Sequence, residues 1–186
     1  MKATDVLRNE HNGILEMLAV VEAAAYRLRD GKSVPPDMLA NAAGFFQNFA
    51  DKCHHHKEEG ELFPLLLQHG IPRDGGPIGV MLEEHEQGRT LVRRMKDAAD
   101  KFAIGDVSAK VELVLSALEY VRLLREHIDK ENGVLFPMAD SLLSESEQDE
   151  MSDSFERIEA DEMGPGVHER YHAMIGEYQK LSVGWN

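Results

Sequence analysis

Two stretches of this chain share one pattern. The first is Cys53-His54-His55-His56-Lys57-Glu58-Glu59-Gly60-Glu61-Leu62-Phe63-Pro64, and the second is His127-Ile128-Asp129-Lys130-Glu131-Asn132-Gly133-Val134-Leu135-Phe136-Pro137. Both contain His-x-x-Lys-Glu-x-Gly-x-Leu-Phe-Pro. In a helix, residues four apart lie on one face, so each copy can direct an imidazole and a carboxylate at one point. The repeat predicts a metal site with mixed nitrogen and oxygen ligands.

Four long segments of the chain repeat hydrophobic residues every three to four positions, which is the spacing of an amphipathic helix. They span roughly residues 4–30, 36–69, 80–104 and 106–137, with stretches that contain Gly or Pro between them. The sequence has no strand-like alternation of polar and apolar residues. The pattern predicts an all-α fold, an antiparallel up-down four-helix bundle.

The last part of the chain differs because its hydrophobic residues are sparser. Ser144 followed by Glu147 has the form of a helix capping box, and a further helix is expected beyond it. We expect residues 1–143 to form the bundle. Residues 144–186 are expected to form a C-terminal helical extension packed on the same domain, as a cover over one end or as an interface.

Length, charge and cysteine content exclude several classes of protein. A chain of 186 residues suits one domain that needs no disulfides, and its single Cys fits a reducing compartment. The net charge of −14 should repel nucleic acid and anionic membrane surfaces, although it also fits an ordinary solvated acidic surface. The start of the sequence lacks the order of a signal peptide, and no apolar run suits a membrane helix. We therefore expect a cytoplasmic protein without nucleic-acid or membrane partners.

The second motif offers one clear ligand pair, His127 and Glu131. The first motif offers two pairs with the same spacing, His54 with Glu58 and His55 with Glu59. An α-helical projection at about 100° per residue puts His54 at the border of the apolar stripe and His55 nearly opposite it. Alignment with the second motif also selects His54 and Glu58. His55 and Glu59 are expected to be solvated, with a supporting role at the metal left open.

The other two bundle helices each offer one histidine, His11 and His85. A single histidine on an apolar face is more often a hydrogen-bonded core residue than a ligand. Here, however, each of the four predicted helices carries one, and two of them add a carboxylate four residues later. A mixed imidazole and carboxylate set inside a bundle fits iron or manganese, as one ion or as a pair, and imidazole also suits zinc.

These motifs together resemble the hemerythrin-like (HHE cation-binding) family over roughly residues 4–140. The resemblance implies a non-haem di-iron centre, oxo- or hydroxo-bridged, inside the bundle. It implies a diatomic or peroxide ligand such as oxygen, peroxide or nitric oxide, or a role in iron sensing or iron delivery for repair. The ligand positions that it implies are His11, His54, Glu58, His85, His127 and Glu131.

The chain departs from the oxygen carriers of that family at one position. Those proteins have two histidines four apart on the third helix, whereas here Arg89 follows His85 by four residues. One iron would then lack a nitrogen ligand, and the open position favours reactivity or sensing over oxygen carriage. His168 and His172, four apart in the expected last helix, could supply a substitute. The alternative is an exposed helix with surface histidines.

We therefore expect a di-iron protein that binds or senses small ligands or iron. Two alternatives stay open, an enzyme that processes peroxide or nitric oxide at the same site and a metal-free or zinc-loaded structural bundle. A ferritin-type oxidase is disfavoured because its helices use Glu-x-x-His, whereas the order here is His-x-x-x-Glu. The sequence does not identify the physiological ligand or the oligomeric state.

Overall fold

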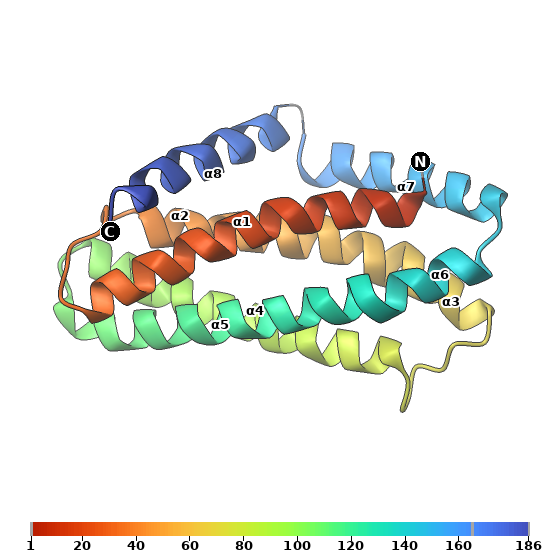
Figure 1. The fold of residues 1–186 in the computed structure, drawn as a ribbon, viewed down its shortest axis with the longest axis horizontal. Coiled ribbons are helices and arrows are strands. Elements are labelled where there is room, and N and C mark those ends of the chain that lie inside the picture. Colours follow the sequence, from red (N-terminus) through yellow and green to blue (C-terminus); the bar gives the residue numbers. More distant parts are fainter. Residues whose placement is uncertain (1, 165, 186) are drawn as a thin grey trace.

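The computed structural model describes residues 2–164 and 166–185, and these residues form helices and connecting turns without a strand. The predicted all-α bundle is confirmed. Its first arm is α1 (Ala3–Arg29) and its third is α4 (Pro77–Ala103). The second arm joins α2 (Met38–Phe45), η1 (Phe46–His55), η2 (Glu58–Leu62) and α3 (Phe63–Gln68); the fourth joins η3 (Val107–Ala109), α5 (Lys110–Lys130), η4 (Glu131–Leu135) and α6 (Phe136–Leu142). Successive arms run in opposite directions (Figure 1).

The arms that carry the two motifs are not α-helical throughout. The segments η1, η2 and η4 are π-helical, with i→i+5 hydrogen bonds; η1 and η2 include most of the first motif, and η4 includes Glu131–Leu135 of the second. Each arm returns to α-helix at the Phe-Pro pair, where α3 and α6 begin with Pro in the first turn. Proline is tolerated there because its missing N–H would lack a partner in a first turn anyway.

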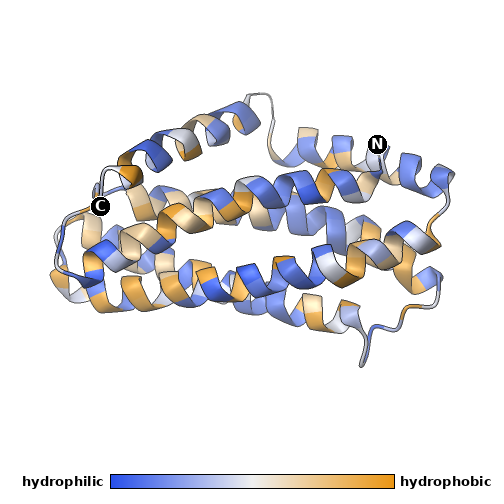
Figure 2. Ribbon diagram, in the orientation of Figure 1, coloured by the Kyte–Doolittle hydropathy of each residue, from blue (hydrophilic) through white to orange (hydrophobic). Residues whose placement is uncertain are grey.

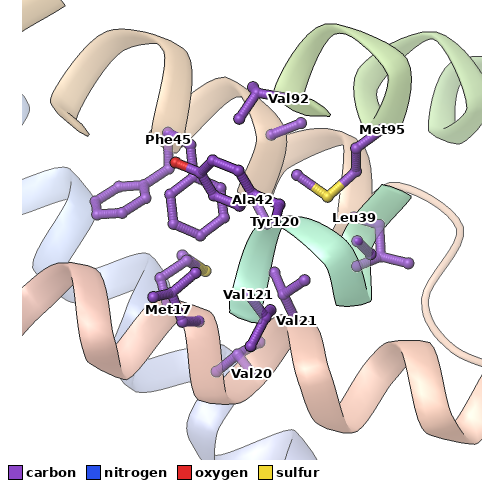
Figure 3. Packing of buried hydrophobic residues seen from close by; sticks show 14 of the residues in the cluster. Met17, Val20, Val21, Leu39, Ala42, Phe45, Val92, Met95, Tyr120 and Val121 are labelled. Atoms are coloured by element: carbon purple, nitrogen blue, oxygen red, sulfur yellow. The ribbon is translucent and has the colours of Figure 1, made fainter. Parts of the chain in front are cut away.

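Two hydrophobic clusters fill the bundle on either side of a buried polar layer. Along α1, for example, His11 lies between Leu7 of the smaller cluster and Ile14 of the larger one. Figure 2 shows the same change along the fourth arm, where a hydrophilic stretch at the end of α5 separates the hydrophobic residues of α5 from those of α6. Figure 3 shows part of the larger cluster, in which Phe45 and Tyr120 come from different arms. The apolar clusters hold the arms together, so the polar layer between them is fixed in position.

The C-terminal residues form α7 (Glu145–Glu162) and α8 (Val167–Val183), which run along α1 and in its direction (Figure 1). Helix α7 begins with the expected capping box, in which Ser144 and Glu147 exchange hydrogen bonds. It also contacts η1 and η2, while Ile175 and Tyr178 of α8 join the larger hydrophobic cluster. The division of the chain at residue 143 stays a prediction. No described helix is both long and apolar enough to cross a membrane.

Candidate metal centre

The polar layer brings the predicted ligand residues from all four arms to one place. One group contains His55, Glu58, His85 and His127, and within it the candidate ligand atoms lie within 4.8 Å of one another. The second group meets the same limit and consists of His11, His54, Glu58 and Glu131. All of these side chains are buried, and Glu58 belongs to both groups. The six positions selected from the sequence therefore meet, together with His55.

The two glutamates lie between the groups, with one oxygen directed at each. Glu131 Oε1 is 3.2 Å from His127 Nε2, and Glu131 Oε2 is 3.2 Å from His11 Nε2. Glu58 Oε1 is 3.5 Å from His54 Nε2, and Glu58 Oε2 is 3.5 Å from His85 Nε2. A carboxylate that offers one oxygen to each of two neighbouring positions is suited to bridge two ions.

Polar atoms at the middle of the layer have no hydrogen-bond partner. Among the described residues, both carboxylate oxygens of Glu58 and of Glu131, together with Nε2 of His11 and His54, are buried and unsatisfied. Burying such groups without partners costs several kcal/mol, so a native structure seldom leaves them in this state. Imidazole nitrogens and carboxylate oxygens directed at two points are a suitable ligand set for two transition-metal ions. The residues present therefore fit a pair of metal ions.

The ionisation of the layer leads to the same conclusion. Burial raises the pKa of Glu58 well above its usual value, and the neighbouring carboxylate of Glu131 raises it further. Burial also opposes ionisation of Glu131, but His127 and His11 lower the pKa of that carboxyl overall. Burial and the nearby His127 lower the pKa of His85 to about 3. Two carboxylates this close need positive charge between them, and cations bound there would supply it.

Equivalent hydrogen-bond chains hold the two motif histidines from outside. His54 donates through Nδ1 to Glu10 at 2.8 Å, and Glu10 in turn accepts from Lys57. His127 donates through Nδ1 to Glu84 at 3.0 Å, and Glu84 accepts from Lys130. In each histidine this leaves Nε2 for the centre, an arrangement that metal-binding histidines commonly use.

The glutamates and lysines of these chains were not among the predicted site residues. Both motifs nevertheless contain the lysine, three residues after the histidine. In addition, each glutamate directly precedes a ligand histidine of its own helix, as in Glu10-His11 and Glu84-His85. These two regularities are the sequence signal that could have identified the supporting residues.

The histidines of α1 and α4 are held in a matching way. His11 donates through Nδ1 to Asn132 at 3.0 Å, and His85 donates to Glu59 at 2.6 Å. The Phe-Pro pairs supply the apolar contacts. Phe136 stacks on His11 with a centroid distance of 5.4 Å, and Phe63 stacks on His85 at 5.9 Å. The two motifs thus provide ligand residues of their own, the polar partners of His11 and His85, and the aromatic rings that stack on these two histidines.

The expectation that His55 is solvated was wrong. Its residue surface is only 4% exposed, and its ring stacks on His85 with a centroid distance of 3.8 Å. The projection assumed 3.6 residues in a turn, but η1 is π-helical and has more. The wider turn brings the consecutive residues His54 and His55 to the same interior. Glu59 lies outside both ligand groups, with a side chain that is 28% exposed and accepts a hydrogen bond from His85.

The structure also changes the interpretation of Arg89. Its guanidinium donates to Asp51 at 2.7 Å and to Glu59 at 2.6 Å, so it joins the carboxylates that lie beside His55 and His85. His55 adds an imidazole to the same group of potential ligand atoms as His85. The expectation from the sequence did not count this imidazole, and the loss of a nitrogen ligand stays a prediction.

His168 and His172 do not reach the centre. They belong to neither ligand group and line a cavity of about 380 Å³ whose wall also includes Glu10. Because Glu10 is hydrogen-bonded to His54, a layer of protein separates these two histidines from the buried ligands.

Comparison with known proteins agrees with this geometry. A family model described as Hemerythrin HHE cation binding domain matches residues 2–139. An uncharacterized protein of Mycobacterium tuberculosis is 28% identical over 178 residues, which cover 96% of this chain and 69% of that protein.

Two relatives named as iron-sulfur cluster repair proteins are also similar. YtfE of Edwardsiella ictaluri is 30% identical over 131 residues, or 69% of this chain and 59% of that protein. DnrN of Neisseria gonorrhoeae is 34% identical over 102 residues, or 52% of this chain and 64% of that protein. The matched part therefore spans less than two thirds of either repair protein.

Proposed function

Because the chain belongs to the hemerythrin HHE cation-binding family, we propose that it holds two iron ions in the polar layer and binds a small ligand there. His55, His85 and His127 would hold one ion, and His11 and His54 the other. The two glutamates would bridge them. The observation that carries this proposal is the pair of buried, unsatisfied carboxylates, Glu58 and Glu131, each with one oxygen directed at each group.

The two sides of the centre offer different numbers of nitrogen ligands. The side of His55 has three imidazoles, and the side of His11 has two, while the glutamates serve both. The ion with fewer protein ligands has more room for an external molecule. We therefore place the ligand on the side of His11 and His54, instead of on the side of Arg89.

The iron ions and the protein side chains would contribute different functions at this centre. Iron with imidazole and carboxylate ligands can exchange electrons with a small molecule such as oxygen, peroxide or nitric oxide. The chain fixes the tautomers of its histidines through Glu10, Glu84, Glu59 and Asn132. It also excludes bulk water, because the ligand side chains are buried between two apolar clusters. These features support a ligand-binding or sensing protein.

A second candidate function follows from the relatives. YtfE and DnrN are named for iron-sulfur cluster repair, so this chain could donate iron to a damaged cluster or process nitric oxide or peroxide at the same centre. Mixing the iron-loaded protein with a cluster-depleted ferredoxin separates these roles. Transfer of iron supports repair, whereas consumption of many equivalents of nitric oxide or peroxide supports an enzyme.

Metal analysis tests the leading proposal directly. After anaerobic reconstitution with Fe²⁺ and exposure to air, we expect about two irons per chain, as in the two-metal sites of other proteins, and a near-ultraviolet absorption band of ferric iron. E131A should lose the iron and the band, because Glu131 faces both groups, and H127A should lose the iron on its own side. Failure to retain iron, with zinc retained or no metal at all, would contradict the proposal and favour the structural bundle.

A further inference from the structure

Arg89 belongs to a closed network of contacts between the second and third arms, beside the candidate centre. Its Nε donates to Asp51 at 2.7 Å, and its Nη2 donates to Glu59 at 2.6 Å. Glu59 also accepts a hydrogen bond from Nδ1 of His85 at 2.6 Å. Asp51 Oδ1 lies 3.5 Å from Nδ1 of His55, whose ring stacks on that of His85 at 3.8 Å between centroids. The network therefore joins Arg89 to two of the proposed ligand histidines.

The shape of the arginine side chain lets it hold both carboxylates at once. A guanidinium group is planar, stays charged and presents its N–H donors in a rigid fork. Asp51 and Glu59 each accept from a different nitrogen of this plane. The oxygen that accepts from Arg89, Oδ1 of Asp51 or Oε1 of Glu59, is also the oxygen that faces a histidine. Movement of the guanidinium would therefore displace the atoms that face His55 and His85.

The contacts to the two histidines differ in strength. The 2.6 Å hydrogen bond from His85 to Glu59 is short, and it fixes the direction of that ring. Nδ1 of His55 has no hydrogen-bond partner among the described residues, because Asp51 at 3.5 Å is at the outer limit of such a bond. The stacked ring of His85 is the closer support of His55. Loss of the Glu59 contact should therefore disturb this side of the centre more than loss of the Asp51 contact.

We propose that Arg89 is a positioning residue for the side of the centre that has three imidazoles. By holding Asp51 and Glu59 in place, it keeps His55 and His85 stacked and directed at one ion, and it has no such role for the other ion. Outer contacts of this kind orient metal-binding histidines. The inference rests on the proposed di-iron centre. It assigns a function to a side chain that cannot itself bind a metal ion.

Arg94 shows what an ordinary ion pair on the same helix looks like. Its Nε donates to Glu112 at 2.7 Å, and its Nη1 lies 3.6 Å from Glu119. Both glutamates belong to α5, the neighbouring arm, and are about half exposed. In the part of the chain that the structure describes, neither of them faces a ligand histidine. Arg94 is therefore the matched control for Arg89, because it also contacts two carboxylates of another arm.

The surroundings of Arg89 make a rescue experiment possible. Arg89, Asp51 and His55 all line a cavity of about 300 Å³, and the Arg89 side chain is 21% exposed. In R89A, a free guanidinium ion should be able to reach the two carboxylates from solvent. Guanidinium otherwise weakens protein folds. Restored iron binding would therefore point to the lost contacts and not to a general gain in stability.

Iron competition and Mössbauer spectroscopy of the full-length protein, reconstituted with isotopically enriched iron, test the proposal. R89A should lower the affinity for one iron by about tenfold or more, the usual effect of losing an outer contact. It should change the Mössbauer signal of that iron and leave the other iron unchanged. Millimolar guanidinium chloride should restore both the affinity and the signal. R89K should restore them only in part, because an ammonium group lacks the fork.

The other variants separate positioning from stability. E59Q should resemble R89A more closely than D51N does, and R94A should leave the affinity and both signals unchanged. An unchanged affinity in R89A overturns the proposal. A loss that guanidinium does not restore, or an equal loss in R94A, overturns it as well, because either result would assign Arg89 a role in stability alone.

The iron-free protein keeps this inference apart from the di-iron proposal. Nuclear magnetic resonance can follow the Nδ1 proton of His85, identified by its absence in H85A. This proton should exchange with water slowly in the unchanged protein and faster in R89A, and R94A should not differ from the unchanged protein. Equal exchange in R89A and the unchanged protein overturns the role of Arg89 without reference to iron. Failure of the unchanged protein to retain iron contradicts the di-iron proposal instead.

Discussion

Lys57 and Lys130 occupy the same position in the two motifs and make the same contact, but their surroundings differ. Each donates to a glutamate that orients a ligand histidine. The Lys57 side chain is 0% exposed, lies beneath Phe155 of α7 and also faces Glu159. The Lys130 side chain is 41% exposed. The motif therefore sets the inner contacts of both halves, while the extension decides how deeply one of them is buried.

The halves differ a second time beside the motif histidines. Position 55 is histidine in the first motif, and the equivalent position in the second is Ile128, which packs in the larger hydrophobic cluster. Asp51 and Arg89 accompany His55 as polar neighbours. The first motif thus has an imidazole and a polar network at the position where the second motif has an apolar contact. The two motifs therefore share the His-x-x-Lys-Glu-x-Gly-x-Leu-Phe-Pro pattern and differ at the residue that follows the histidine.

The largest effect is expected for the residue that serves both halves. Glu58 lies in both ligand groups, whereas His11 lies in one. E58A should lose both irons. H11A should lose only one iron, or bind it less tightly, because His55, His85 and His127 still hold the other. Iron analysis after reconstitution and gel filtration measures this. Equal loss in both variants would mean that the two positions do not bind independently.

The buried lysine should matter more for folding than the exposed one. K57M removes one partner of a buried ion pair and leaves Glu10 without its cation, which should lower the free energy of unfolding by about 3 kcal/mol. K130M removes a half-exposed partner and should cost about 1 kcal/mol or less, since solvent screens that pair. Urea denaturation of the iron-free proteins compares them. Equal losses would show that the cover by α7 does not isolate Lys57.

His55 can be replaced by isoleucine, the residue at the equivalent position, Ile128, of the second motif. H55I should lower the affinity for one of the two irons by about a hundredfold, because one linked ligand is removed from one side of the centre. The affinity for the second iron should stay unchanged. Competition with a chromophoric Fe²⁺ chelator measures both affinities. H56I is the matched control, since the His56 side chain is 50% exposed and lies beside Glu162. An unchanged affinity in H55I would assign this ring a packing role.

The smallest effect concerns the start of α7. Hydrogen bonds from His69 and Ser144 lower the pKa of Glu147 from its ordinary 4.5 to about 2. A carboxyl with a lowered pKa stabilises the fold above its ordinary pKa, and this contribution disappears as the pH falls through the lowered value. E147Q should therefore lower the unfolding temperature at pH 7.

The difference between E147Q and the unchanged protein should shrink as the pH falls from about 4.5 towards about 2. Thermal unfolding followed by circular dichroism at several pH values measures it. Glu145, in the same first turn, is the matched position for a control variant, E145Q. A difference that stays constant across this range would show that the charge of Glu147 is not its source.

The sequence alone determined the bundle and six of the residues that meet in the polar layer. Both follow from local regularities, because the apolar spacing defines each helix and the four-residue spacing of His127 and Glu131 places them on one face. The repeat of the motif then selected His54 and Glu58. Such inferences need no knowledge of which helices are neighbours.

Only the tertiary structure decided the position of His55 and the difference between the two lysines. The first depends on π-helical turns in η1, which change the direction of each side chain and leave no simple periodicity in the sequence. The second depends on α7, whose Phe155 lies over the buried Lys57, whereas the Lys130 side chain is 41% exposed. Burial depends on the neighbours that pack on a residue, so two motifs with the same pattern in one chain acquire different environments.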